Sequence, residues 1–430
     1  MAKFNVVRGM RDLLPKDAEE RRHLVDIIRH MFKIYGYEEV ETPVIEYFDL
    51  ISAKIGEEIR HRMYTFNDLS GRKVALRPEM TAPVARLVAT KLRTTLKPLR
   101  LGYIANCFRY DNPQQGRYRE FLQAGFEIFG SRRPEADAEI LIVSSDLMDR
   151  VGFKNHYFKV GQAGILRSIL DAEEVNEENQ GAIIGLIDKG KQSEAVNLLN
   201  NLNISKKCVE AIKTLFKLKG SDFEAVLKEG ESLLKEYKTS LPALANLREI
   251  LNLTIKSGVT AQINIDLGFA RGLEYYTGMI FETYVPNINI ALNGGGRYDK
   301  LIETFGGEPT PAVGCAPGID RINLAMEKQN LFHKKTAEKK ILIISVNDEL
   351  RPQAMKISQK LRNEGLVVET EILGKSIKKA LSYANTKSCK FVIIIAPKEL
   401  QKGNAIIKDM EQGTQKEVSI DKLSEEIKIT

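Results

Sequence analysis

Strict alternation of apolar and polar positions is clearest in residues 119–128, where it predicts a β-strand with two different faces. One face is apolar and suits a hydrophobic core: Leu122, Ala124, Phe126 and Ile128. The other face is of mixed chemistry: Arg119, Phe121, Gln123, Gly125 and Glu127. A glycine inside a strand weakens it unless another group must come close. We therefore interpret the mixed face as the floor of a pocket.

This strand is the second half of a β-hairpin predicted over residues 107–130. The connecting residues, 111–120, are polar, and arginines lie at the base of the loop: Arg109, Arg117 and Arg119. Guanidinium groups bind phosphate and carboxylate groups through paired hydrogen bonds. The loop therefore suits a flexible anionic ligand, such as a polyphosphate or the end of an RNA.

Helical spacing dominates the first part of the chain, after a short arm with the sequence Arg-Gly-Met-Arg-Asp at residues 8–12. Apolar residues recur every three or four positions over 17–35, and Gly36 is a typical C-terminal stop. The next segment is extended around Pro43. Because proline cannot donate to a strand ladder, this segment belongs at a sheet edge or a partner contact.

A strand followed by a helix is predicted next. Residues 73–77 form the strand, and Pro83 opens the helix. Glu79 and Thr81 lie at the junction, where side chains can project into a shared cleft. On local grounds, Thr81 is equally suited to cap the helix.

Residues 171–255 lack strand periodicity and are rich in Glu, Lys, Leu, Ala and Asn, which predicts an inserted helical subdomain. Within it, residues 185–191 imitate the spacing of a phosphate-binding loop. Gln192 stands where the metal-binding Ser or Thr of such a loop must be. We therefore interpret this similarity as a coincidence.

Glycines surround several candidate site residues after a predicted strand at 262–267. Arg271 lies among flexible glycines next to the sheet, where a guanidinium group needs an anion. Tyr275 and Tyr276 follow, and either a buried core or a binding site fits them. Further on, the three glycines at 294–296 are placed after a strand, where bare backbone lets a ligand lie directly on it.

A second arginine with an unexpected position is Arg321, which falls in the first turn of a predicted helix. A basic residue there opposes the helix dipole. Its presence indicates an external anion or a stacked ring rather than helix stabilisation.

The period of the pattern changes after a charged linker at 327–338. Residues 339–430 alternate strands and helices, which predicts a small α/β domain with a largely parallel sheet. This segment holds 17 Lys and Arg against 12 Asp and Glu. Such a basic accessory domain indicates nucleic acid as a partner, although a solvated lysine-rich surface also explains the charge.

Amino-acid composition gives limited information on the compartment and the class of the protein. The 430 residues carry a formal charge of +7, and the four cysteines lie far apart without a paired motif, which favours free thiols in a reducing compartment. The five histidines show no metal-ligand spacing, so we expect no structural metal. The sequence has neither a bilayer-length apolar run nor a signal-peptide core, and we expect a soluble, cytoplasmic protein without membrane contact.

Taken together, these stretches resemble the histidyl-tRNA synthetases, a family of class II aminoacyl-tRNA synthetases. The segment around Pro43, residues 108–129 and residues 314–321 are similar to the three motifs of that class. The sequences Arg-Gly-Leu-Glu-Tyr-Tyr-Thr-Gly at 271–278 and Leu-Arg-Pro-Glu-Met-Thr at 76–81 are similar to histidine-specific signatures. The family often has Asp at the position of Glu274 and Gly at the position of Met80.

The resemblance implies an α+β fold. It consists of an antiparallel sheet flanked by helices, a helical insertion, and a C-terminal α/β anticodon-binding domain. The expected boundaries are 1–170 and 256–326 for the two parts of the catalytic domain, 171–255 for the insertion, 327–338 for the linker and 339–430 for the anticodon-binding domain.

The implied reaction joins L-histidine to ATP, releases pyrophosphate, and transfers histidine to the terminal adenosine of histidine tRNA. Arg271 and Arg109 would be the catalytic residues, because each would stabilise charge on the α-phosphate. Residues implied to bind histidine are Glu79, Thr81, Gln123, Glu127, Arg271, Tyr275 and Tyr276. Residues implied to bind ATP are Arg109, Arg117, Phe121, Gly294, Gly295, Gly296 and Arg321.

The resemblance also implies Mg²⁺ carried with ATP, no metal held by the protein alone, and a homodimer. The closest alternative is a catalytically silent paralogue, such as the regulatory subunit of ATP phosphoribosyltransferase. Such subunits usually lack the segment at 271–276 and the C-terminal domain, and this chain has both.

Overall fold

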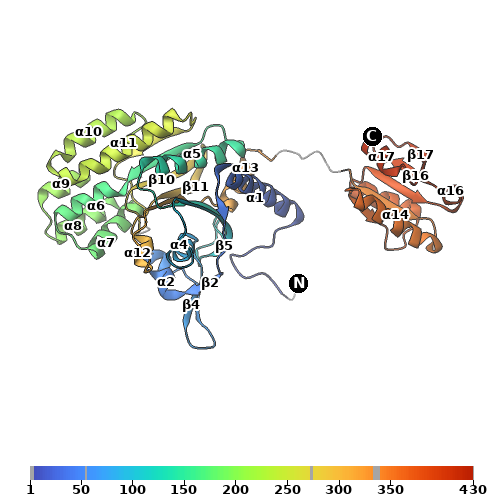
Figure 1. The fold of residues 1–430 in the computed structure, drawn as a ribbon, viewed down its shortest axis with the longest axis horizontal. Coiled ribbons are helices and arrows are strands. Elements are labelled where there is room, and N and C mark those ends of the chain that lie inside the picture. The colour runs from blue at the N-terminus through green and yellow to red at the C-terminus, as the bar shows by residue number, and fades with distance from the viewer. Residues whose placement is uncertain (1–3, 54–55, 272–274, 333–338, 430) are drawn as a thin grey trace. The chain divides into compact units, whose positions relative to one another are not determined.

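The structure, a computed structural model, describes residues 4–53, 56–271, 275–332 and 339–429 (Figure 1). The chain divides into two compact units, Met1–Phe332 and His333–Thr430. Glu274, one of the two departures from the family pattern, lies outside the described residues, as does part of the predicted linker. The other departure, Met80, is fully buried.

The larger unit is built on a nine-stranded sheet in the order β1-β5-β6-β12-β11-β10-β7-β9-β8. Two of its pairings, β1 with β5 and β7 with β9, are parallel and the others are antiparallel, which confirms the predicted sheet. Its strands are β1 (Glu38–Glu39), β5 (Leu99–Phe108), β6 (Glu120–Phe129), β7 (Tyr157–Gln162), β8 (Lys219–Gly220), β9 (Gln262–Asp266), β10 (Met279–Val285), β11 (Ile288–Arg297) and β12 (Ala312–Cys315). A small antiparallel sheet combines β2 (Ile45–Tyr47), β4 (Lys73–Leu76) and β3 (Thr65–Asn67).

The predicted hairpin is formed by β5 and β6, which pair along their whole length from Leu99↔Phe129 to Phe108↔Glu120. The apolar face of β6 packs into the main core. Phe126, for example, lies edge-on to Phe32 with 4.9 Å between ring centroids. The alternation along the strand therefore separates a core face from a second face, as predicted.

Helices cover this sheet, and their starts and ends follow local chemistry. Helix α1 begins at Pro15, close to the prediction, and ends before Gly36, whose φ of 70° suits a glycine. The helices are α1 (Pro15–Tyr35), α2 (Phe48–Ser52), α3 (Glu57–Arg60), α4 (Thr81–Thr90), α5 (Pro134–Arg150), α12 (Leu301–Thr304) and α13 (Ile319–Lys328). No helix among the described residues combines the length and the apolar character that a bilayer crossing requires.

The stretch from 171 to 255 is mostly helical, as predicted, and its helices gather at one side of the larger unit (Figure 1). They are α6 (Ala163–Ala172), α7 (Glu177–Asp188), α8 (Gln192–Asn201), α9 (Lys206–Leu215), α10 (Phe223–Leu233) and α11 (Leu241–Lys256). Between them, the two-residue strand β8 joins the edge of the large sheet beside β9.

The smaller unit has a five-stranded sheet in the order β14-β13-β15-β16-β17, flanked by helices. Its elements are β13 (Ile341–Ser345), α14 (Arg351–Asn363), β14 (Val368–Thr370), α15 (Ile377–Thr386), β15 (Phe391–Ile395), α16 (Pro397–Gln401), β16 (Asn404–Asp409), β17 (Gln415–Ser419) and α17 (Leu423–Ile429).

The predicted largely parallel sheet of this unit is wrong in its second half. Only β13 with β14 and β13 with β15 run parallel, whereas β15 with β16 and β16 with β17 run antiparallel. The reason is the length of the connections. Residues 396–403, which include the short helix α16, join β15 to β16, and residues 410–414 join β16 to β17. Both connections are shorter than the crossover of a dozen or more residues that a parallel pairing needs.

Candidate active site

A cavity of about 320 Å³ lies over the polar face of β6 in the larger unit. Its walls come from β6, β11, β12, the start of α4 and the start of α13. It brings together almost all of the predicted site residues: Glu79, Thr81, Arg109, Arg117, Phe121, Gln123, Glu127, Arg271, Tyr275, Tyr276, Gly294, Gly295 and Arg321. Gly296 is the exception and does not line this cavity.

The space beside Gly125, in the predicted floor of the pocket, is occupied by another side chain of the protein. A Cβ atom at this position would overlap the ring of Tyr103, the residue that pairs with Gly125 across the hairpin. Close approach is therefore the reason for the glycine, as predicted, but the approaching group is a tyrosine side chain. Its hydroxyl donates to Oε1 of Glu127 at 3.3 Å.

The side chain of Glu79 binds the N-terminal end of helix α4. Its two carboxylate oxygens accept hydrogen bonds from the backbone N–H groups of Thr81 and Ala82, each at 2.8 Å. The helix therefore begins at Thr81, two residues before Pro83, where the sequence had predicted its start. The capping role considered for Thr81 belongs to Glu79, which leaves the Thr81 hydroxyl to donate to Glu127 at 3.3 Å.

Glu127 is the most buried charged group in the cavity wall, with 1% of its surface exposed. Hydroxyl groups surround its carboxylate: Thr81 and Tyr103 reach Oε1, and Tyr298 donates to Oε2. Burial raises the pKa of Glu127 to about 8, although the bond from Tyr298 acts in the opposite direction. At neutral pH burial therefore favours the protonated carboxyl group, which has both a donor and an acceptor oxygen.

Three arginines of the cavity donate to backbone carbonyls: Arg109 to Pro78, Arg271 to Phe281 and Arg321 to Ala291, at distances of 2.7 to 2.9 Å. Within the described residues, no carboxylate forms an ion pair with any of the three. Arg117 lies 3.8 Å from Asp111, which Arg62 also contacts at 3.1 Å.

The guanidinium groups are close enough to influence each other. The pKa of Arg321 falls to about 10, first because the group is buried and then because Arg117, Arg109 and Arg271 repel its charge. A cluster of cations with few carboxylate partners is a site prepared for an anion of several charges. The three segments that supply these arginines are far apart in the sequence, and the fold brings them together.

The glycines at 294–296 have a different reason from the predicted one. They lie inside β11 rather than after it. A Cβ atom at Gly294 would overlap Nη1 of Arg271, and one at Gly296 would meet the carbonyl of Met279. Similarly, a Cβ atom at Gly314 would overlap the carboxylate of Glu127. Gly294 and Gly314 therefore make room for charged side chains of the site, and Gly296 makes room for the backbone of the neighbouring strand β10.

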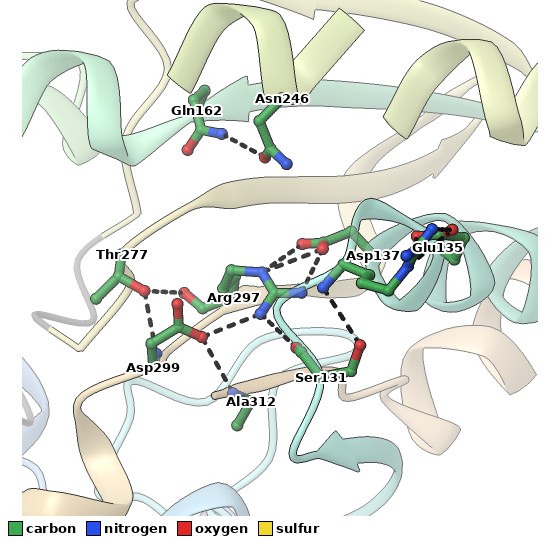
Figure 2. A network of polar contacts seen from close by, with 10 residues as sticks. Ser131, Glu135, Asp137, Gln162, Asn246, Thr277, Arg297, Asp299 and Ala312 are labelled. Atoms are coloured by element: carbon green, nitrogen blue, oxygen red, sulfur yellow. Dashed lines mark hydrogen bonds and ion pairs between the residues drawn. The ribbon is translucent and has the colours of Figure 1, made fainter. Parts of the chain in front are cut away.

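The end of β11 is held by a buried ion pair, shown in Figure 2. Arg297 donates from Nε to Oδ1 of Asp137 in α5 at 3.0 Å, and from Nη1 to Asp299 at 3.1 Å. Thr277 is bound to the same unit, because its N–H donates to the Arg297 carbonyl at 2.8 Å and its hydroxyl accepts from the Asp299 N–H at 3.0 Å. This network fixes the chain directly after Tyr275 and Tyr276.

Sequence reasoning missed the two tyrosines that contact Glu127, Tyr103 and Tyr298. The position of Tyr103 opposite Gly125 follows from the register of the hairpin, so counting back from the loop could have found it. Nothing in the local sequence around Tyr298 indicates that its hydroxyl reaches Glu127, 171 residues earlier. The described residues contain no cluster of three His, Cys, Asp or Glu that could hold a metal ion.

Comparison with known proteins gives matches over nearly the whole chain. A family model described as histidyl-tRNA synthetase matches residues 9–322, and a model described as anticodon binding domain matches residues 340–430. Proteins named histidine–tRNA ligase from Methanocaldococcus jannaschii and Pyrococcus horikoshii are 45% and 39% identical. Each alignment covers 98% of this chain, with 99% and 98% of the relatives.

Solved structures agree with the sequence matches. The histidyl-tRNA synthetase from Nostoc sp. PCC 7120 superposes with a TM-score of 0.78 at 25% identity, and the comparison covers 100% of both chains. A protein from Bacillus halodurans gives a TM-score of 0.77 at 27% identity over 92% of this chain and 100% of its own. It is described as an ATP phosphoribosyltransferase regulatory subunit/histidyl-tRNA synthetase.

Proposed function

We propose, because this chain belongs to the histidyl-tRNA synthetase family, that the cavity over β6 is where histidine is activated. The protein is an ATP-dependent aminoacyl-tRNA ligase: it forms histidyl-adenylate and transfers histidine to the 3′ end of histidine tRNA. One observation carries the assignment to this cavity. A hydroxyl-lined carboxylate lines the same cavity as Arg109, Arg271 and Arg321, three arginines that form no ion pair with a carboxylate of the described residues.

The arginines suit the ATP half of the reaction. In the first step an oxygen of the histidine carboxylate attacks the α-phosphorus, and the bond to pyrophosphate breaks. Arg109 and Arg271 stabilise the charge that develops on the α-phosphate, because fixed cations in a dry site need no rearrangement during the reaction. Arg117 holds the outer phosphates, and Phe121 and Arg321 enclose the adenine ring. The backbone of Gly294 and Gly295 borders the nucleotide.

The buried oxygens suit the amino acid half. Glu79, Thr81 and Gln123 offer acceptors to the α-ammonium group, and Arg271 faces the carboxylate. Glu127, with Tyr275 and Tyr276, reads the imidazole ring. An imidazole presents one donor and one acceptor when neutral. A carboxyl group whose pKa is near 8 can match either nitrogen, and an apolar side chain could satisfy neither.

Mg²⁺ enters with ATP and not as a resident ion. Such an ion usually takes phosphate oxygens, waters and one or two carboxylates. Glu282, which lines the cavity, would be the protein ligand of the ion. The ion would neutralise charge on the outer phosphates.

The partners follow from the same assignment. The smaller unit, with its surplus of basic residues, binds the anticodon region of histidine tRNA. Removing residues 339–430 should therefore weaken tRNA charging far more than adenylate formation.

A second copy of the chain covers β2 and its flank, where Val44, Ile45 and Tyr47 are apolar and exposed. Because its tRNA serves translation, we place the homodimer in the cytoplasm.

The experiment that tests the assignment is exchange of pyrophosphate into ATP in the presence of each of the twenty amino acids. Histidine alone should support exchange. Exchange with another amino acid would overturn the specificity, and no exchange at all would favour the regulatory-subunit alternative. That alternative is not favoured by the chain, since Arg271 lines the cavity and the anticodon binding domain is present.

A further inference from the structure

The N-terminal arm has the sequence Arg-Gly-Met-Arg-Asp at residues 8–12, and none of these residues is among those proposed to contact histidine or ATP. We propose that Arg11 is a positioning residue for ATP: it holds together the two sides of the nucleotide part of the cavity from outside. This inference rests on the proposed function, because it names a residue that acts through others on the same site.

The arm is bound to the hairpin next to the start of β6. The Arg119 N–H donates to the Gly9 carbonyl at 2.9 Å, and its guanidinium group donates to the Arg8 carbonyl at 3.2 Å. Gly9 has a φ of +85°, and a Cβ atom there would lie 2.7 Å from Cδ of Arg119. Only glycine lets the arm lie this close, so the position of Arg11 is set by the backbone before it.

Arg11 ends this arm in a partly buried ion pair. Its Nη2 lies 2.5 Å from Oδ1 of Asp320, a residue of the cavity wall with 6% of its surface exposed. The Cζ atom of Arg11 also lies 3.8 Å from the centre of the Tyr118 ring, in the loop of the hairpin. One side chain therefore touches both helix α13 and the loop.

Asp320 explains why this contact matters for the nucleotide. Its second oxygen, Oδ2, accepts the backbone N–H of Leu122 at 2.7 Å and so ties α13 to β6. The residues next to these two, Arg321 and Phe121, are the pair proposed to enclose adenine. One carboxylate thus sets the spacing of both, and Arg11 neutralises it.

Loss of Arg11 should act on ATP selectively. Asp320 would keep a single donor and an uncompensated charge at the cavity wall, opposite the arginines that attract the phosphates. Histidine is placed by Glu79, Gln123 and Glu127, and Arg11 touches none of them. A defect of the whole fold would change the binding of both substrates.

The test compares Arg11→Ala with Arg8→Ala in the full-length chain by histidine-dependent pyrophosphate exchange. Arg8 is a matched control, because it lies on the same arm and is exposed, and its contact with Arg119 uses only its backbone carbonyl. Arg11→Ala should raise the KM for ATP about tenfold, with the KM for histidine within about twofold of wild type. Arg8→Ala should leave both values unchanged.

Two further variants test the route through Asp320. Arg11→Lys keeps the charge but loses the planar contact with Tyr118, so it should restore part of the ATP affinity. In the Asp320→Asn background, Arg11→Ala should change the KM for ATP less than twofold, since the charge it neutralises is gone. The inference is overturned by equal effects of Arg11→Ala and Arg8→Ala, by parallel changes in both KM values, or by additive effects in the double variant.

The two proposals fail in different ways. If the wild-type protein shows no histidine-dependent exchange, the proposed function is wrong. If the wild type is active and Arg11→Ala matches Arg8→Ala, only the role of Arg11 is wrong.

Discussion

Strand β6 in the larger unit and strand β15 in the smaller unit are both buried, but they bury different chemistry. Every residue of β15, Phe391–Ile395, is apolar, and its two faces enter two cores on opposite sides of the sheet. Strand β6 buries Gln123 and Glu127 on one face: Gln123 accepts from the backbone N–H of Met80, and Glu127 accepts from hydroxyl groups. Strand β15 serves only packing, and strand β6 carries the candidate site.

The difference shows where each unit can bind a ligand. A buried polar group is tolerated only when its hydrogen bonds are satisfied, and an apolar strand needs no such partners. Because the polar face of β6 is satisfied mostly by side chains around a cavity, that sheet offers its face to a substrate. The sheet of the smaller unit is covered on both faces, so a partner must meet its loops, edges or helices.

Of the substitutions that test this difference between the two units, the largest effect is expected from one among the arginines of the cavity. Arg271→Ala should slow adenylate formation in a single turnover by about two to four orders of magnitude, the range for losing one stabilising donor in the transition state. Histidine affinity should change far less. Arg248→Ala is the matched control, because its ion pairs with Glu224 and Glu231 lie far from the cavity lining. A near-normal rate for Arg271→Ala would remove it from the catalytic role.

A smaller effect is expected from the apolar strand. Ile393→Ala removes a fully buried side chain from β15 and should lower the free energy of unfolding of the smaller unit by about 2–5 kcal/mol, as measured by urea denaturation. Ile372→Ala, at a position 81% exposed, should change it by less than about 0.5 kcal/mol. Histidine-dependent exchange should be unaffected by both, and a parallel loss of exchange would show that the units depend on each other.

The smallest effect concerns the polar face of β6. The pKa of Glu127 rises from 4.5 to about 8 on folding, so between these values the folded chain holds a proton that the unfolded chain has released. Stability contributed by this group is therefore lost as pH rises through that range. Glu127→Gln should remove this loss, so the stability of the variant relative to wild type should increase by roughly 2 kcal/mol from pH 6 to pH 8.

Urea denaturation at several pH values measures the effect of Glu127→Gln, and Glu229→Gln, on the surface of α10, is the control. Parallel pH profiles for wild type and Glu127→Gln would show that the carboxyl group is already ionised in the folded protein. A profile that flattens only for Glu127→Gln would confirm that burial holds its proton.

Local patterns predicted the elements of the site well. The alternation in β6 placed Phe121, Gln123 and Glu127 on one face, and the helical spacing gave α1 to within two residues. The arginines were recognisable because a cation beside glycines or at a helix start has no local partner. These signals depend on neighbours within a few residues, which a sequence displays directly.

One error arose where a distant group decides the structure. The sequence indicated that Gly294 must stay bare, but the occupant of the space is Arg271, which the fold brings from another segment. Two other errors were local. The start of α4 depends on the carboxylate of Glu79, which accepts from the first N–H groups of the helix, and the strand direction in the smaller unit depends on the short connections between its last strands.

The amino-acid sequence by itself determined the two-faced strand, the positions that had to remain glycine, the cationic residues and the family. Only the tertiary structure decided which side chains fill the glycine gaps, which hydroxyl groups surround Glu127, and that the N-terminal arm reaches Asp320. The physical reason is range. Periodicity and backbone preference act between neighbours, whereas burial, hydrogen bonding and charge act between whatever residues the fold brings together.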